Sequence, residues 1–190
     1  MALREGTELR ILDAAEELFF SRGVAATPID AVIERAGVSA ATLYRGWASK
    51  EALLAAALER RQRAWIAVWD AAVDRATDDS GRLLAVFDAL DDFRAQPRGS
   101  RWCAFLGAAA EYADAPAEVS AAVREDTRAL RDRLTVLAHP LVGKEQRAAE
   151  LAEQLLLVVS GELAMRLREP GAGSSTARAV AAALVTAARR

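Results

Sequence analysis

The sequence predicts an all-helical protein of about nine helices. Apolar residues recur at helical spacing along nearly the whole chain of 190 residues, and alternating strand patterns are scarce. Hydrophobic residues make up 53% of the chain and charged residues 27%, a composition that excludes intrinsic disorder. No apolar stretch reaches the roughly 20 residues of a membrane span, and a single cysteine excludes an intrachain disulfide. We therefore expect a cytoplasmic protein with no membrane partner.

The first two helices are predicted from the signals at their ends. Apolar residues at helical spacing run over residues 5–22, and Gly23 ends that helix. Thr27 is expected as the N-cap of a second, short helix with Pro28 in its first position. Gly37 ends this second helix.

The remaining helices follow from capping residues and from breaks that contain proline or glycine. Ser39 is expected to cap a third helix that reaches about Arg45. Ser49 is expected to cap a fourth that runs from Lys50 to about Ala76. Five more helices are expected over approximately 80–96, 101–113, 117–138, 145–168 and 175–189, with a break at Pro140–Gly143.

Residues 27–47 are expected to form two short helices joined by a tight glycine turn. Such a helix-turn-helix can place its second helix in the major groove of double-stranded DNA. The residues that would then face the DNA are Ser39, Ala40, Ala41, Thr42 and Tyr44. The same spacing also fits an αα-hairpin inside an ordinary bundle, and spacing alone leaves both interpretations open.

The charge of the chain gives no general attraction to nucleic acid. The formal net charge is −2, and residues 1–63 contain nine Lys and Arg against nine Asp and Glu. DNA binding would therefore need a local concentration of positive charge. The residues that could supply it on one side are Arg35, Arg45, Lys50, Arg60, Arg61 and Arg63.

One segment carries a family resemblance. Residues 26–47 read ATPIDAVIERAGVSAATLYRGW and continue as ASKEALL, and residues 11–19 upstream read ILDAAEELF. This segment resembles the DNA-binding domain of the TetR (tetracycline-repressor-like) family of transcriptional regulators. The resemblance implies a DNA-binding domain over 1–63, with its helix-turn-helix at about 28–47, and a ligand-binding and dimerisation domain over 64–190.

The same resemblance implies a function. It points to a ligand-responsive regulator, a repressor that binds a palindromic operator as a homodimer and is released by a small lipophilic or aromatic effector. No enzymatic activity, cofactor or metal is implied. An alternative is a helical sensor or protein-interaction bundle with weak or no specific DNA binding.

The resemblance also assigns DNA-contacting roles by position. The positions concerned are Thr27, Pro28, Ser39, Ala40, Ala41, Thr42, Tyr44, Arg45 and Lys50. Three positions depart from the family pattern, which commonly has a threonine at Pro28, a basic or polar residue at Ala40, and histidine or tyrosine at Gly46.

Aromatic residues beyond residue 63 are candidates for an effector pocket, although residues of this kind more often belong to an ordinary core. The candidate lining is Trp65, Trp69, Phe87, Phe93, Trp102, Cys103, Phe105, Leu106, Tyr112, Glu162 and Arg166. Glu111, Glu162 and Arg166 stand on otherwise apolar segments, so if they are buried each needs a partner, either a ligand or an ion pair.

The last two helices are candidates for the dimer interface. The apolar residues that we expect there are Leu151, Leu155, Val158, Val159, Ala181, Leu184, Val185 and Ala188. The alternative is that these stripes pack inside a single chain.

Overall fold

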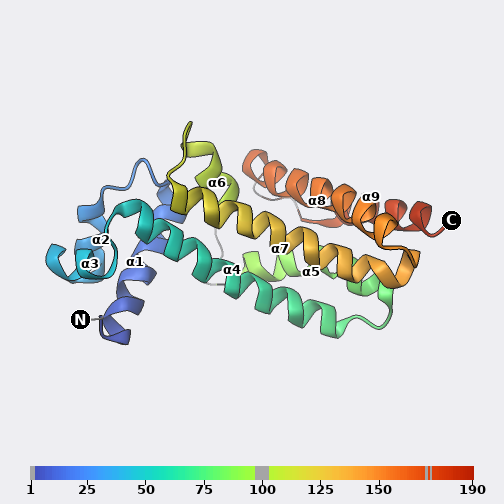
Figure 1. Ribbon diagram of the computed structural model, residues 1–190, viewed down its shortest axis with the longest axis horizontal. Coiled ribbons are helices and arrows are strands. Elements are labelled where there is room, and N and C mark those ends of the chain that lie inside the picture. The colour runs from blue at the N-terminus through green and yellow to red at the C-terminus, as the bar shows by residue number, and fades with distance from the viewer. Residues whose placement is uncertain (1–2, 97–102, 170, 172) are drawn as a thin grey trace. The chain divides into compact units, whose positions relative to one another are not determined.

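The computed structural model describes residues 3–96, 103–169, 171 and 173–190, and this part of the chain forms nine α-helices and no strand (Figure 1). The all-helical prediction is confirmed. The helices are α1 Glu5–Arg22, α2 Ile29–Ala36, α3 Ala40–Gly46, α4 Lys50–Arg75, α5 Asp79–Ala95, α6 Ala104–Glu111, α7 Ala117–Val142, α8 Glu145–Arg168 and α9 Ser175–Ala188.

Most of the predicted helix ends are confirmed by their geometry. Gly23 and Gly37 follow α1 and α2 with positive φ angles of 91° and 63°. Ser39 Oγ accepts a hydrogen bond from the backbone N–H of Thr42 at 3.2 Å, so it caps α3. Ser49 Oγ accepts one from the N–H of Ala52 at 3.0 Å at the start of α4.

Two predicted ends are wrong. Pro28, with no side-chain cap, occupies the N-cap of α2 in place of Thr27. The α7 helix does not stop before Pro140 but continues to Val142. A proline there removes one N–H donor in the last turn only, and Leu141 packs against the core of this part of the chain. Gly143, with φ 69°, then ends the helix.

The chain folds into two compact units. The first contains the described residues within 1–62 and 102–124, and the second those within 63–101 and 125–190. Both α4 and α7 contribute residues to both units. The first unit is not continuous in sequence, because Phe105, Ala108 and Val119 join its core. The functional division at residue 63 stays a prediction.

In the first unit α1 packs on α2, which contacts α3, around a core of large apolar side chains. Ile11, Phe19, Leu43 and Leu53 are fully buried there. Leu43 is the only buried residue of α3, so it anchors this short helix to the core.

In the second unit α8 and α9 lie side by side, and α9 also packs on α5 (Figure 1). The fully buried side chains of this core include Trp69, Phe87, Leu134 and Leu155. Among the helices of the described residues, none combines the length and the apolar character of a membrane span.

Candidate nucleic-acid interface

The α3 helix presents most of its surface to solvent. Ser39, Ala40, Ala41 and Arg45 are exposed, and Tyr44 has an exposed fraction of 49%. All five belong to the set of DNA-contacting positions that the resemblance implies, and the structure brings them together on one short helix and its N-cap. A helix that is buried on one side and exposed on the other can enter the major groove of DNA, which is wide enough to admit an α-helix.

The N-terminus of α3 carries two neighbouring hydroxyl groups. Ser39 Oγ and Thr42 Oγ1 lie 2.9 Å apart and share a hydrogen bond. Only one of the two O–H groups is used in that bond, so the other remains able to donate. Together with the helix N-terminus, this group has the character of an anion-binding end.

Gly46, the last residue of α3, is exposed but lies against the Leu3 side chain of the N-terminal segment. A Cβ atom on Gly46 would lie 2.4 Å from Leu3 Cδ1. The absence of a side chain therefore makes room for Leu3, and a larger residue at position 46 would require the Leu3 side chain to move.

Several cationic residues that were expected to gather on one side are committed to partners within this unit. Arg35 forms an ion pair with Glu17 at 2.7 Å. Arg60 pairs with Asp13 at 2.7 Å and also with Glu16.

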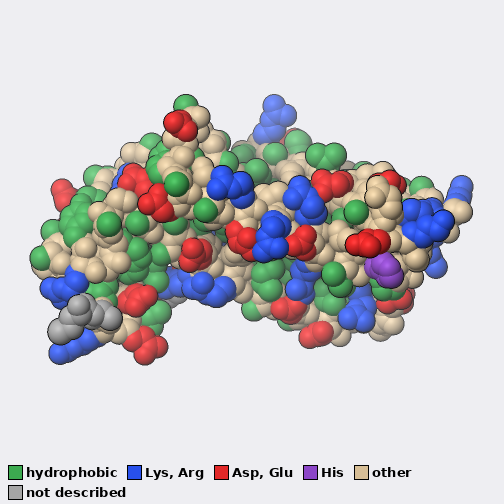
Figure 2. Space-filling model, viewed as in Figure 1, with side chains coloured by type: hydrophobic (Ala, Val, Ile, Leu, Met, Phe, Trp, Pro, Cys, Tyr) green, Lys and Arg blue, Asp and Glu red, His purple; other side chains and the backbone are tan. Residues whose placement is uncertain are grey.

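Arg61 is buried 5.2 Å from the centre of the Phe20 ring, and this burial lowers the pKa of its guanidinium. The expected concentration of positive charge is therefore reduced to exposed residues such as Arg45 and Arg63. On the visible face in Figure 2, cationic and acidic side chains are interspersed.

Thr27 and Pro28 lie just ahead of α2, in different surroundings. Thr27 is 1% exposed, and its hydroxyl donates to the carbonyl oxygen of Gly23 at 2.7 Å and to that of Leu18 at 3.3 Å. The hydroxyl is therefore used inside the unit, which does not support the expected phosphate contact of Thr27, and that contact stays a prediction. Pro28 is exposed.

The loop between α1 and α2 is also held by two charged side chains from distant parts of the sequence. The Glu111 carboxylate accepts hydrogen bonds from the backbone N–H groups of Val24, at 2.9 Å, and Ala25, at 2.5 Å. Lys50 Nζ donates to the carbonyl oxygen of Val24 at 2.5 Å. The sequence indicates that Glu111 needs a partner if it is buried. It does not identify Val24 and Ala25 as that partner, because they lie 87 and 86 positions away from Glu111.

The predicted effector-pocket residues are divided between the two units. Cys103, Phe105, Leu106 and Tyr112 belong to the first unit, and Trp102 lies outside the described residues. The second unit contains Trp65, Trp69, Phe87, Phe93, Glu162 and Arg166.

Three aromatic rings of the second unit form a cluster. The ring centres of Trp65 and Trp69 are 5.7 Å apart, and Phe93 meets Trp65 edge-on at the same distance. Arg133 of α7 lies 4.9 Å from the centre of the Trp69 ring. Neither Trp69 Nε1 nor Arg133 Nε, both buried, has a hydrogen-bond acceptor among the described residues. The cluster therefore carries donors that an acceptor could satisfy.

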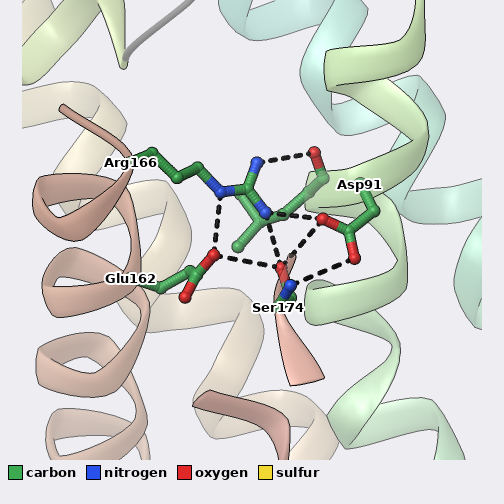
Figure 3. Close-up of polar contacts among 5 residues, drawn as sticks. Asp91, Glu162, Arg166 and Ser174 are labelled. Carbon is green, nitrogen blue, oxygen red and sulfur yellow. Dashed lines mark hydrogen bonds and ion pairs between the residues drawn. The ribbon is translucent and has the colours of Figure 1, made fainter. Parts of the chain in front are cut away.

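Glu162 and Arg166 are buried, with exposed fractions of 8% and 5%, and the structure gives them internal partners (Figure 3). Arg166 Nε donates to Glu162 at 2.8 Å, and Arg166 Nη2 donates to Asp91 of α5 at 2.7 Å and to Ser174 Oγ at 2.5 Å. Arg166 Nη1 donates to the carbonyl of Leu90 at 3.1 Å. Of the two expected alternatives, the ion pair is therefore the one that the structure shows.

The predicted dimer stripe is mostly internal. Leu151, Leu155, Val159, Ala181 and Val185 are buried in the core of the second unit, and Val158, Leu184 and Ala188 are partly buried against it. Buried side chains do not form a surface on which another chain packs, so within this set only the partly buried Val158, Leu184 and Ala188 are available for contact, and the interface stays a prediction. Other apolar side chains of these two helices are exposed, namely Leu157 and Met165 on α8 and Val180 on α9.

Comparison with known proteins places this arrangement among regulators. A family model described as bacterial regulatory proteins, tetR family, matches residues 11–57. The chain is 31% identical over 151 residues to the HTH-type transcriptional activator FasR of Mycolicibacterium smegmatis, which covers 80% of this chain and 67% of that protein. It is 44% identical over 50 residues to YdeS of Bacillus subtilis, named an uncharacterized HTH-type transcriptional regulator; that match spans 26% of this chain and 25% of YdeS.

Solved structures extend the likeness to nearly the full chain. A TetR-family transcriptional regulator of Streptomyces coelicolor, SCO4454, superimposes with a TM-score of 0.86 at 27% identity and covers 98% of both chains. A regulator of Streptomyces avermitilis gives a TM-score of 0.79 at 26% identity, over 96% of this chain and 97% of that one. The reduced form of NemR from E. coli shares the fold, with a TM-score of 0.75 at 20% identity over 95% of this chain and 96% of NemR.

Proposed function

The chain belongs to the TetR family of bacterial transcriptional regulators, and from this premise we propose that it is a ligand-responsive repressor that binds a palindromic operator as a homodimer. The observation that carries the proposal is α3, a short helix anchored by Leu43 and exposed along Ala40, Ala41, Tyr44 and Arg45. Such a regulator acts on DNA in the cytoplasm and needs no catalytic group.

In this proposal α3 enters the major groove, and its N-terminus lies against the phosphate backbone. Ala40 and Ala41 contribute apolar contact, of the kind that suits thymine methyl groups. Ser39, Thr42 and Tyr44 supply hydroxyl groups and Arg45 supplies charge for the backbone, while Pro28 lies at the edge of this surface.

Binding to DNA from beside the protein's own gene, compared with scrambled DNA across a salt series, tests the proposal. Selective binding that weakens with salt supports it, because neutralised phosphates release counterions. Selection from a random DNA pool is the second step. Failure to enrich any sequence would favour the alternative, a helical sensor or interaction bundle without specific DNA binding.

The direction of control is a separate part of the proposal. FasR, one of the relatives, is named an activator. We propose repression because steric exclusion of polymerase from a bound operator requires no further surface on the protein. A reporter driven by the selected operator should be less active when the protein is present, and higher activity would show an activator.

The effector in this proposal is a lipophilic or aromatic compound with a hydrogen-bond acceptor. The Trp65, Trp69 and Phe93 cluster supports the aromatic part, and the unpartnered donors Trp69 Nε1 and Arg133 Nε support the acceptor. Aromatic acids and their neutral analogues can be screened by the quenching of tryptophan fluorescence and then for release of DNA. Equal binding by acids and analogues that lack any acceptor would contradict this chemistry.

The homodimer in this proposal is formed by the exposed face of α8 and α9. Regulators of this family bind DNA and form dimers. Leu157, Met165 and Val180 supply exposed apolar surface on these two helices. Two copies would present two α3 helices and read a palindrome, which raises the affinity of a weakly charged reader.

A further inference from the structure

We propose that Glu111 and Lys50 are positioning residues that clamp the loop ahead of α2, and that Lys50 supports DNA affinity through this loop rather than through a phosphate. The inference rests on the proposed DNA-binding function of α3. It replaces the direct phosphate contact expected for Lys50.

The loop sets the direction in which the chain enters the helix-turn-helix. Gly23 has φ 91° and ψ 154°, a conformation that is essentially restricted to glycine. The Thr27 hydroxyl then ties the end of the loop back to the carbonyl oxygen of Gly23 at 2.7 Å. Because α2 begins two residues later, at Ile29, any change in this loop alters how α2 and α3 are presented.

Glu111 binds the loop from the end of α6. Its two carboxylate oxygens accept from consecutive backbone N–H groups, those of Val24 and Ala25. Hydrogen bonds to an ionised carboxylate are about twice as strong as neutral ones. A Cβ atom on Gly23 would lie 3.2 Å from Glu111 Oε1, so the same glycine also leaves room for the carboxylate.

Lys50, at the start of α4, binds the same loop at Val24. Its ammonium donates to the carbonyl oxygen of Val24 and lies 5.9 Å from the centre of the Phe19 ring. Val24 therefore has its N–H held by a side chain of α6 and its C=O held by a side chain of α4. The ammonium is directed into the unit, toward a backbone carbonyl and an aromatic ring, which suits a positioning role.

The test separates a positioning role from a phosphate contact by salt dependence. The affinity of wild type, Lys50→Met, Glu111→Gln and the double variant is measured on one selected operator by fluorescence anisotropy across a potassium chloride series. We expect each single variant to bind roughly tenfold more weakly with an unchanged salt slope. The double variant should bind no more weakly than the worse single variant, because both act on one loop.

Two variants serve as references. Arg45→Ala, which removes an exposed cation of α3, should lower the salt slope by about one, as the loss of a phosphate contact does. Glu118→Gln, at an exposed glutamate in the first turn of α7 in the same unit, should leave affinity and slope unchanged. A slope lowered by about one in Lys50→Met, with losses that multiply in the double variant, would overturn the proposal.

Amide exchange in the DNA-free protein tests the clamp independently of the operator. We expect the Val24 and Ala25 amides to exchange faster in Glu111→Gln than in wild type, because a glutamine amide offers only one acceptor oxygen. Unchanged exchange at both amides would overturn the clamp. A wild type that binds no DNA would refute the proposed function, while the exchange result would still decide on the clamp.

Discussion

At the residue scale, Gly23 is the position where backbone geometry constrains the sequence most. Its φ of 91° lies in a region that other residues occupy at a cost of about 1–3 kcal/mol. We expect Gly23→Ala to lower the free energy of unfolding by about that amount, as measured by urea denaturation. It should also weaken DNA binding, because a Cβ atom would approach Glu111 Oε1 to 3.2 Å.

The matched control for this change is Gly6→Ala. Gly6 lies in the first turn of α1 with helical backbone, and a Cβ atom there would meet no atom within 4 Å. Alanine is favoured over glycine inside a helix by roughly 0.5–1 kcal/mol, so this variant should be slightly more stable than wild type. Equal effects of the two substitutions would show that the φ angle of Gly23 carries no special cost.

Asp126 on α7 leads to a prediction about how the stability of the protein depends on pH. Its carboxyl is partly buried, and desolvation raises the pKa to about 7 from an ordinary value of 3.8. The folded protein then keeps a proton that the unfolded chain releases, so the contribution of Asp126 to stability falls as the pH rises from about 4 to about 7 and changes no further above that. The cost at high pH is of order 4 kcal/mol.

Replacement of Asp126 by asparagine removes this titration. We expect Asp126→Asn to exceed wild type in melting temperature at pH 8 and to approach it below pH 5. Thermal melts over this range, with the exposed Asp132→Asn on the same helix as control, measure the difference. A constant offset at every pH would mean that Asp126 ionises normally in the folded protein.

At the element scale, local signals in the sequence predict the helices well, but they do not predict contacts between residues that are far apart in the sequence. Gly37 and Ser39 mark helix ends through interactions with residues only a few positions away. The break predicted at Pro140 is wrong, because the packing of Leu141 compensates for the break that the local pattern predicts. In the candidate site the exposure of α3 followed from its motif, whereas the pairing of Glu111 with the 24–25 amides depends on how distant segments meet.

The polar cluster of Figure 3 joins three helices in the second unit. Arg166 of α8 binds Glu162 on its own helix, Asp91 of α5 and the Ser174 side chain at the N-terminus of α9. Removing one partner of a buried pair leaves the other charge without compensation, which costs about 3–5 kcal/mol. We expect Arg166→Met to destabilise the protein by about this amount in chemical denaturation.

The double variant Arg166→Met, Glu162→Leu distinguishes charge from packing. Apolar replacement of both partners removes the uncompensated carboxylate, so it should recover a large part of the lost stability. Asp91→Asn, at a residue whose side chain is about half exposed, should cost much less than Arg166→Met. If the double variant is no more stable than Arg166→Met, lost packing rather than buried charge explains the effect.

At the scale of the whole molecule, the sequence does not show which face of α8 packs inside its own chain and which face is exposed. Both faces carry apolar residues, since Leu151, Leu155 and Val159 point into the core while Leu157 and Met165 are exposed. A periodic pattern shows that a helix is apolar on more than one side but does not show which side meets its own chain. The first group, although predicted for the interface, is buried in the core.

The exposed face leads to the prediction for the assembled protein. Leu157 has an exposed fraction of 74%, and Leu157→Asp would place a charge on the proposed dimer surface, where it would be desolvated without a partner. We expect this variant to sediment as a monomer in analytical ultracentrifugation. Its operator affinity should fall at least about 100-fold, because the second half-site contact then loses its effective concentration.

Val136→Asp is the control, since Val136 is 70% exposed on α7 in the same unit and lies outside the proposed surface. It should remain a dimer with wild-type operator affinity. This result would show that an acidic residue at an exposed apolar position does not by itself cause dissociation. If instead Leu157→Asp stays dimeric and Val136→Asp dissociates, the two chains meet through α7. If both variants stay dimeric, the interface lies elsewhere, and the spacing of the two α3 helices that a palindrome requires must be set by another surface.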